Sequence, residues 1–404
     1  MERNQRILLI LCVVYGLWNN GSQWTTTLLS FLQWDTIHVM SIVDIGYIQS
    51  FGSFCNAIGA LAAGQIADTT GPKTMLLLST IVTSIYYSSL AFARCWYSFF
   101  FLQLFRMGYL LDAVAEMYLA TITTERERTK ALMRFTVPQA IAMFLGPMLA
   151  SQLAVKTTLR GSQFICGVTL LVTLTPLIYF MLPYTHTVPK LATARLRPQD
   201  YLPMVKNNSA LREGILLRGL LIAAYVCYEL ISRNFLLRSL MQVNPNDSAK
   251  VLIVMGTSLL VAQFLFLPFL QKRLYPRSVL ITALAALTFA YTLTSFANSL
   301  NQLLVIVAVQ TACYSVAYAE TCTQITSAVD MTDLGKATGL ASAAQWIIHF
   351  IVPIYTSHLV QHWHYTYAFY TSGILSLLTL CYIILVAKHP NARVNSLLPS
   401  IYLA

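Results

Sequence analysis

Residues 75–93 read MLLLSTIVTSIYYSSLAFA, an apolar run without a single charged side chain. An α-helix needs about 20 such residues to cross the hydrocarbon core of a bilayer. Backbone N–H and C=O groups in lipid have to be paired within their own segment, so a run of this length forms a helix. The stretch therefore predicts a membrane-spanning helix.

Comparable runs recur at residues 164–183, 251–270 and 374–387. Charged residues make up only 10% of the 404 positions and hydrophobic residues 57%, whereas about a quarter of a soluble domain is charged. The sequence also lacks the alternating segments of about ten residues that a membrane β-barrel needs. We predict an all-α polytopic membrane protein with twelve spans, near residues 7–30, 42–67, 73–93, 97–121, 132–155, 161–182, 213–237, 249–270, 277–297, 300–325, 335–358 and 365–387.

The net charge of +11 is unevenly distributed over these spans and loops. With a cytoplasmic N-terminus, eighteen of the 26 Lys and Arg residues fall in inner segments and five in outer loops. This is the positive-inside bias of membrane proteins, and it explains the basic balance without a nucleic-acid partner. Trp34, Trp96 and Trp363 then lie at the outer interface, where indole rings prefer to sit. We expect both termini to be cytoplasmic, and the first hydrophobic segment to be a retained helix, because it is too long for a signal peptide.

The two halves of the chain repeat one pattern at a fixed spacing. Five residues in and just before the fifth predicted span recur unchanged 206 positions later. They are Lys130, Ala131, Gln139, Ile141 and Pro147, which match Lys336, Ala337, Gln345, Ile347 and Pro353. A long polar stretch separates the halves. We therefore predict a six-helix bundle over residues 1–183, a cytoplasmic linker over 184–212, a second six-helix bundle over 213–388 and a cytoplasmic tail over 389–404. Duplicated halves of this kind are typical of secondary transporters.

The stretch GQIADTTGPK at residues 64–73 carries a second signal. Gly64 allows two helices to approach closely and Asp68 can cap a helix end. Gly71 can make the turn, and Lys73 is expected to meet the inner leaflet or a neighbouring helix. The pattern resembles the loop 2–3 signature of the major facilitator superfamily, with Thr69 where that family usually has arginine.

Two further segments extend this resemblance. Gly146-Pro147 is similar to the antiporter signature in the fifth span of the family, with Ala150 and Ser151 in place of two glycines. Residues 45–49 and 333–336 resemble the organic-cation-transporter-like, tetracycline-transporter-like orphan branch of solute carrier family 22. The resemblance implies a major facilitator fold, transport by alternating access, and a substrate cavity lined chiefly by spans 1, 4, 7 and 10. It implies no cofactor.

Polar and ionisable side chains within spans are costly in lipid, which makes them candidates for substrate binding or ion coupling. On spans 1, 4, 7 and 10 these residues are Asn19, Gln23, Arg106, Tyr109, Asp112, Glu116, Tyr225, Glu229, Tyr314, Tyr318 and Glu320.

In the fourth span, Asp112 and Glu116 lie one helical turn apart and share a face with Tyr109. Two carboxyl groups this close can share a proton, which suits a proton-carrying site. The alternative is that Glu116 reaches the inner interface and Asp112 bonds to a neighbouring helix.

The other spans carry similar alternatives. Asn19 and Gln23 either contact the solute or hydrogen-bond between helices. Glu229 can form a structural pair with Arg233, four residues further on. Glu320 is expected to be a second coupling or cation-binding carboxylate, while Tyr314 and Tyr318 lie on a different face of the same helix.

Carboxylates beside aromatic rings suit an organic cation or an amphiphile. We therefore predict proton-coupled export of small organic solutes by a monomer, with the solute, the bilayer and protons as its partners. Two rivals remain: a facilitative uniporter of neutral or anionic solutes, in which Arg106 binds the solute, and a membrane scaffold that does not transport.

Enzymatic and metal chemistry have little support in the sequence. No nucleophile–base set emerges from it, so an enzyme is not expected. His358, His362 and His364 contain one i,i+4 pair, without a carboxylate or cysteine nearby, and we expect no metal there.

Overall fold

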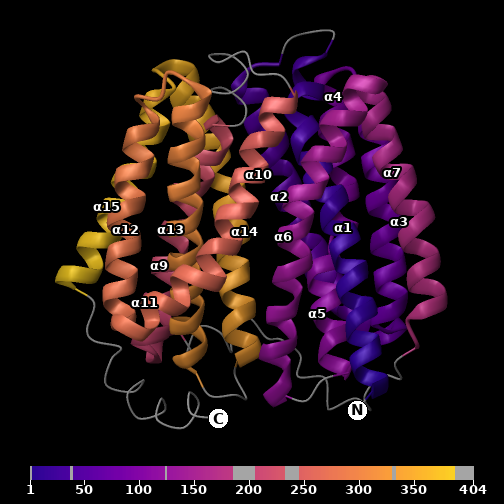
Figure 1. Cartoon of the computed structure of the whole chain (residues 1–404), viewed down its shortest axis with the longest axis horizontal. Coiled ribbons are helices and arrows are strands. Elements are labelled where there is room, and N and C mark those ends of the chain that lie inside the picture. Colours follow the sequence, from indigo (N-terminus) through magenta and orange to yellow (C-terminus); the bar gives the residue numbers. More distant parts are fainter. Residues whose placement is uncertain are drawn as a thin grey trace. The chain divides into compact units, whose positions relative to one another are not determined.

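The computed structural model describes residues 2–36, 40–122, 125–184, 205–232, 245–329 and 334–386. These residues form twelve successive helical passes and no strand, which confirms the all-α prediction (Figure 1). Nine passes are single helices: α1 (Glu2–Trp34), α2 (Ile42–Thr70), α3 (Pro72–Leu90), α6 (Glu125–Lys156), α9 (Ser209–Ile231), α12 (Pro276–Thr294), α13 (Leu300–Ser327), α14 (Leu334–His362) and α15 (Thr366–Leu385).

The fourth, sixth and eighth passes change helix type partway along. They consist of α4 (Trp96–Leu102), η1 (Gln103–Gly108) and α5 (Leu111–Ile122); of α7 (Leu159–Pro176) and η2 (Leu177–Met181); and of α10 (Pro245–Val261), η4 (Ala262–Phe266) and α11 (Leu267–Arg273). The segment η1 is a 3₁₀-helix, whereas η2 and η4 are π-helical. The sequence predicted continuous helices here, because hydropathy does not distinguish helix types.

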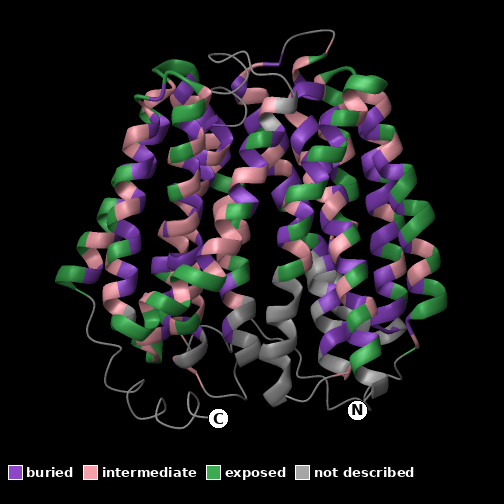
Figure 2. Cartoon of the chain, viewed as in Figure 1, coloured by how far each residue is buried: buried purple, intermediate pink, exposed green. Residues whose placement is uncertain are grey.

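Seven segments of the described chain are long and apolar enough to cross a membrane on those two properties alone. They are Val137–Lys156, Leu159–Met181, Ser209–Ile231, Ala249–Arg273, Arg277–Thr294, Leu300–Ile325 and Thr366–Leu385. Figure 2 shows exposed residues along the outer faces of the helices, and many of these are large and apolar, such as Leu9, Phe180 and Leu385. Exposed apolar faces of this extent are expected of a protein surrounded by lipid.

The chain divides into two compact units. The first contains Met1–Ala194 and Leu236–Thr257, and the second contains Arg195–Phe235 and Ser258–Ala404. Helix α10 begins in the first unit and ends in the second. The bundle boundaries at residues 183 and 213 stay a prediction.

Glycines allow the helices of the first unit to pack closely. A Cβ atom on Gly146 of α6 would lie 2.7 Å from the carbonyl oxygen of Asn20 in α1. A Cβ atom on Gly167 of α7 would lie 2.2 Å from Ser88 Oγ in α3. Such distances are possible only without a side chain, so both contacts require glycine. Gly146 of the antiporter-like signature therefore has a packing role between α1 and α6.

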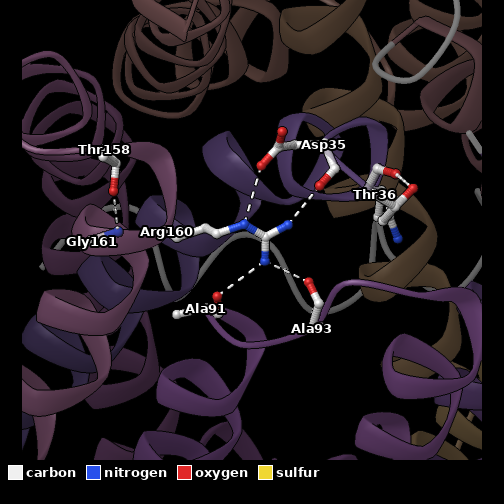
Figure 3. A network of polar contacts seen from close by, with 8 residues as sticks. Asp35, Thr36, Ala91, Ala93, Thr158, Arg160 and Gly161 are labelled. Atoms are coloured by element: carbon white, nitrogen blue, oxygen red, sulfur yellow. Dashed lines mark hydrogen bonds and ion pairs between the residues drawn. The ribbon is translucent and has the colours of Figure 1, made fainter. Parts of the chain in front are cut away.

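Arg160, near the start of α7, ties three helix ends of the first unit together (Figure 3). Its Nε donates to Asp35 Oδ2 at 3.1 Å, and its Nη2 donates to the Asp35 carbonyl oxygen at 2.6 Å. Its Nη1 donates to the carbonyl oxygens of Ala91 (3.1 Å) and Ala93 (2.6 Å), just after α3. Carbonyl groups at helix C-termini lack hydrogen-bond donors within their own helix. Arg160 supplies these donors.

The internal repeat is visible in matched helices. Helices α3 and α12 both contain 19 residues, begin with a proline and start 204 positions apart. In the second unit, a Cβ atom on Gly373 of α15 would lie 2.9 Å from Thr292 Oγ1 of α12. This contact corresponds to the one between Gly167 and Ser88, so the packing of the last helix on the third is duplicated along with the sequence.

Candidate functional site

The fourth pass is broken near its middle. The 3₁₀ segment η1 ends at Gly108, and α5 begins at Leu111. Ser79 of α3 spans the break, because its hydroxyl donates to the Gly108 carbonyl oxygen at 2.8 Å and accepts from the Leu110 N–H at 3.2 Å. The Ser79 side chain thus replaces helical hydrogen bonds that are lost at the break. A backbone in lipid requires such a replacement, because no water is present to pair its polar groups.

The break separates the four candidates of this span. Arg106 precedes it and Tyr109 lies within it, while Asp112 and Glu116 are the second and sixth residues of α5. The shared face predicted for Tyr109, Asp112 and Glu116 assumed a continuous helix, and the break removes that assumption. The side chains of Asp112 and Glu116 lie outside the described residues.

Tyr109 joins an aromatic and hydroxyl cluster in the first unit. Its hydroxyl lies 2.7 Å from Ser22 Oγ and accepts from the Tyr87 hydroxyl at 3.1 Å. Its ring centroid lies 4.9 Å from that of Trp18, a residue only 2% exposed. The cluster links α1, α3 and the break, so Tyr109 has a structural role whether or not it also meets a solute.

Arg106 is held by amides. The Asn56 amide, oriented with its oxygen toward the guanidinium, accepts from Nη2 at 3.0 Å and donates to the Arg106 carbonyl oxygen at 2.8 Å. Nη1 donates to Gln103 Oε1 at 3.4 Å. A Cβ atom on Gly52 would lie 2.4 Å from Nη1, so α2 packs directly on the arginine. These contacts favour a structural role for Arg106 over solute binding.

The first-span candidates differ in their surroundings. Asn19 is buried and donates to the Tyr15 carbonyl oxygen of its own helix at 3.0 Å. Gln23 is half-buried, and its Cβ atom lies 2.8 Å from the position of a Cβ on Gly146. The hydrogen bond of Asn19 lies within α1 and does not join two helices, so solute contact and bonding between helices both stay predictions for Asn19 and Gln23.

The loop 2–3 signature is described in part. Gly71 adopts a φ of 87°, which favours glycine, and precedes α3 as its N-cap. Lys73 is buried, donates to the Tyr179 carbonyl oxygen at 2.8 Å and lies 4.0 Å from the centroid of the Tyr184 ring. Lys73 therefore meets a neighbouring helix. Gly64 and Asp68 fall within α2, and their side chains lie outside the described residues.

Tyrosines gather in the second unit. Tyr225 of α9 stacks on Tyr314 of α13 with centroids 4.4 Å apart, and Tyr314 lies 6.0 Å from Tyr318. Glu229 is half-buried and near enough to interact electrostatically with Tyr314. Its predicted partner Arg233 lies outside the described residues. The structure thus brings together four candidates from the seventh and tenth spans.

The same place holds Arg218, which the sequence showed within a span but did not single out. Its Nη2 donates to the Tyr318 hydroxyl and, at 3.4 Å, to Gln345 Oε1 of α14. Its guanidinium carbon lies 4.5 Å from the centroid of the Tyr318 ring. An arginine at the centre of a span costs about 2.5–3.5 kcal/mol on insertion scales, and that cost alone would have justified including it.

Glu320 lies on another face of α13, as predicted. It is 6% exposed and accepts a 2.8 Å hydrogen bond from Nε2 of Gln271 in α11. Among the described residues no cation lies within ion-pair distance of this carboxyl. Helix α11 directly follows the π-helical segment η4, and such segments often occur at functional sites.

The histidines near the end of α14 form no metal-binding group in the described part of the chain. The rings of His358 and His362 are parallel, with centroids 6.0 Å apart. His364 Nδ1 instead bonds to Thr366 Oγ1 at 2.9 Å.

Comparison with known proteins places this geometry in context. The chain resembles the human organic anion transporter MFSD10 (TETRAN), with 16% identity and a TM-score of 0.69 over 94% of this chain and 99% of that one. It resembles a D-xylose-proton symporter with 14% identity and a TM-score of 0.75, over 95% and 98% of the two chains. It resembles the nucleoside transporter NupG with 14% identity and a TM-score of 0.69, over 94% and 98%. Identities this low establish a shared fold only.

A search of curated proteins finds no significant match. The profile of the Major Facilitator Superfamily matches twice, over residues 7–237 and 234–400. These matches together extend over nearly the whole chain and agree with the twelve helical passes and the internal repeat. The chain belongs to the Major Facilitator Superfamily and is an integral, multi-pass membrane transporter.

Proposed function

We propose that this transporter is a secondary active carrier that couples the movement of a small organic solute to protons through Glu320. The observation that carries the proposal is the pairing of this buried carboxyl with Gln271, a neutral amide. An arginine or lysine partner would hold the carboxyl ionised. An amide accommodates both states, because its NH₂ donates to a carboxylate and its oxygen accepts from a carboxylic acid.

The position of the pair supports proton exchange. Glu320 is buried, whereas its partner Gln271 is exposed in the last turn of α11, beside Lys272 and Arg273 at the predicted cytoplasmic end of the span. Both residues lie close to the π-helical segment η4, where a change in helix type can alter their contact. Asp112, at the start of α5, stays a second candidate by its position on the helix.

The class of solute predicted from the sequence needs revision in this proposal. The cationic class depended on Asp112, Tyr109, Tyr314 and Tyr318 as carboxylates with aromatic neighbours. Tyr314 does lie near Glu229, whereas the side chain of Asp112 lies outside the described residues. The hydroxyl of Tyr109 is engaged by Ser22 and Tyr87, and Tyr318 faces the guanidinium of Arg218. Antiport rests on the resemblance at Gly146-Pro147, and the direction of proton movement in the liposome experiment tests it.

The test is proton flux in liposomes that contain the purified protein, an imposed pH gradient and a trapped pH-sensitive dye. Benzoate, benzamide and benzylamine are added in turn, since they share a ring and differ in charge. Benzoate and benzylamine also cross lipid in their neutral forms, so the collapse is measured as the rate above that in protein-free liposomes. We expect one of the three to collapse the gradient faster with wild type and with Glu213→Gln, a matched change near the start of α9. Glu320→Gln should abolish the collapse.

Two results would contradict the proposal. Undiminished proton flux in Glu320→Gln would exclude this carboxyl as the coupling group. Uptake of labelled solute by wild type without proton movement would favour a uniporter.

A further inference from the structure

Arg218 is a cation with neutral partners inside a helix bundle. It is the tenth of the 23 residues of α9, near the middle of an apolar span. Its surroundings in the described chain are the Tyr318 hydroxyl, the Gln345 amide and the Cys322 thiol, which interacts with it electrostatically. None of these carries a negative charge to balance the guanidinium.

The hydrogen bonds of Arg218 leave much of its donor capacity unused. An arginine has five N–H donors in a planar fork. Nη2 alone is engaged, since Nε is buried without an acceptor and Nη1 has no hydrogen bond to the described residues. A buried, unused donor on a charged group is costly. The site therefore lacks an acceptor that carries negative charge.

The neighbouring aromatic residues indicate what shape that acceptor has. Tyr318 covers the guanidinium, and Tyr314 and Tyr225 continue from it as a row of rings, with centroids 6.0 Å and 4.4 Å apart. A carboxylate matches the planar fork of an arginine. An aromatic ring attached to that carboxylate can make edge or face contacts with the tyrosines.

We propose that Arg218 binds the carboxylate of an aromatic organic anion, whose ring lies along Tyr318 and Tyr314. The Tyr318 hydroxyl and Gln345 are positioning residues, since each accepts from Nη2 and fixes the plane of the guanidinium. This inference rests on the proposed transport function and names its solute class. It also moves the anion-binding role from Arg106, which Asn56 and Gln103 already engage, to Arg218.

The test measures equilibrium binding to the full-length protein in nanodiscs, without a gradient. Labelled benzoate is displaced by unlabelled benzoate, benzamide and benzylamine. We expect wild type to bind benzoate about tenfold more tightly than either analogue, because only benzoate supplies a charged acceptor for the unused donors of Arg218. Arg218→Gln should lose this preference, and Arg218→Lys should retain part of it, since lysine keeps the charge but not the fork.

Arg273→Gln is the matched control. Arg273 lies in the same unit and its guanidinium carbon is 4.4 Å from the centroid of the Phe269 ring, yet it is exposed at the end of α11. This variant removes the same charge and the same kind of aromatic contact, and it should bind benzoate as wild type does. Tyr318→Phe keeps the ring and removes the hydroxyl, so it should weaken benzoate binding about threefold even if Arg218→Gln fails to fold.

Equal affinity for the three ligands, a preference for benzylamine, or no measurable benzoate binding to wild type would overturn the proposal. So would unchanged benzoate binding in folded Arg218→Gln. The outcome is separable from that of the coupling test. Benzoate binding without proton flux leaves the anion site standing and removes the coupling, whereas proton flux driven by benzylamine alone does the reverse.

Discussion

Lys73 and Arg277 stand 204 positions apart and make the same contact in the two halves of the chain. Lys73 Nζ donates to the Tyr179 carbonyl oxygen and Arg277 Nη2 to that of Ile383, both at 2.8 Å and both 106 residues further on. Each acceptor lies in the last turn of its half's final helix, where carbonyls lack intrahelical donors. The basic residue of the third span thus fastens the sixth span in each half.

Removing either contact should lower stability by a similar amount. Lys73→Ala and Arg277→Ala each leave helix-end carbonyls without a charged donor, at an expected cost of about 1.5–3 kcal/mol in the free energy of unfolding. The measurement is thermal unfolding in detergent, with Lys250→Ala as control, because in the described part of the chain Lys250 pairs with Asp247 at the surface. If only one of the two variants were destabilised, the contact would stabilise one half of the chain and not the other, which would contradict this prediction.

Ser79 should be the residue that the broken fourth span depends on most. Ser79→Ala removes that hydroxyl from the Leu110 N–H and the Gly108 carbonyl, which keep a 3.0 Å bond to each other, at an expected cost of about 0.5–1.5 kcal/mol. Thr80→Val is the control, since the Thr80 hydroxyl bonds only to the Leu76 carbonyl of its own helix. Equal melting temperatures of the two variants would contradict a special role for Ser79.

Cys95 should report which side of the membrane the α3–α4 turn occupies. It is exposed, and its hydrogen bond to Ser98 lowers the pKa of its thiol. A lowered pKa means more thiolate at neutral pH, so labelling by an impermeant maleimide should be fast and should accelerate as the pH rises through that pKa. In sealed membrane vesicles, we expect labelling from the face opposite to a tag on the N-terminus. Cys95→Ser should abolish this labelling and Ser98→Ala should slow it. Labelling from the same face as the N-terminal tag would reverse the predicted topology.

Hydropathy and spacing were sufficient to predict the twelve passes and the internal repeat. The match between Pro72 and Pro276, for example, is visible in the sequence and marks equivalent helix starts in the structure. These features are local or periodic, and a single sequence expresses them directly. The turn at Gly71 was predictable for the same reason, because the residue type itself indicates the backbone conformation.

Contacts between distant segments could not be predicted in this way. The break after Gly108 becomes intelligible only with Ser79, a residue 29 positions earlier whose type is ordinary in a span. Arg106 and Arg218 are both arginines within predicted spans, and only their neighbours distinguish them. Amides engage Arg106, whereas Arg218 retains unused donors. Side-chain partners across helices decide these roles, and one sequence does not specify them.

The central claim is that this chain carries a solute across the membrane, and solute counterflow tests it most directly. Liposomes containing the protein are loaded with unlabelled benzoate, benzamide or benzylamine and diluted into a trace of the same labelled compound. The account predicts a transient accumulation of label for one of the three, above protein-free liposomes, because a carrier that alternates between its two sides exchanges solute for solute. Label that never exceeds the protein-free level for any of the three would contradict the account and favour a scaffold that does not transport.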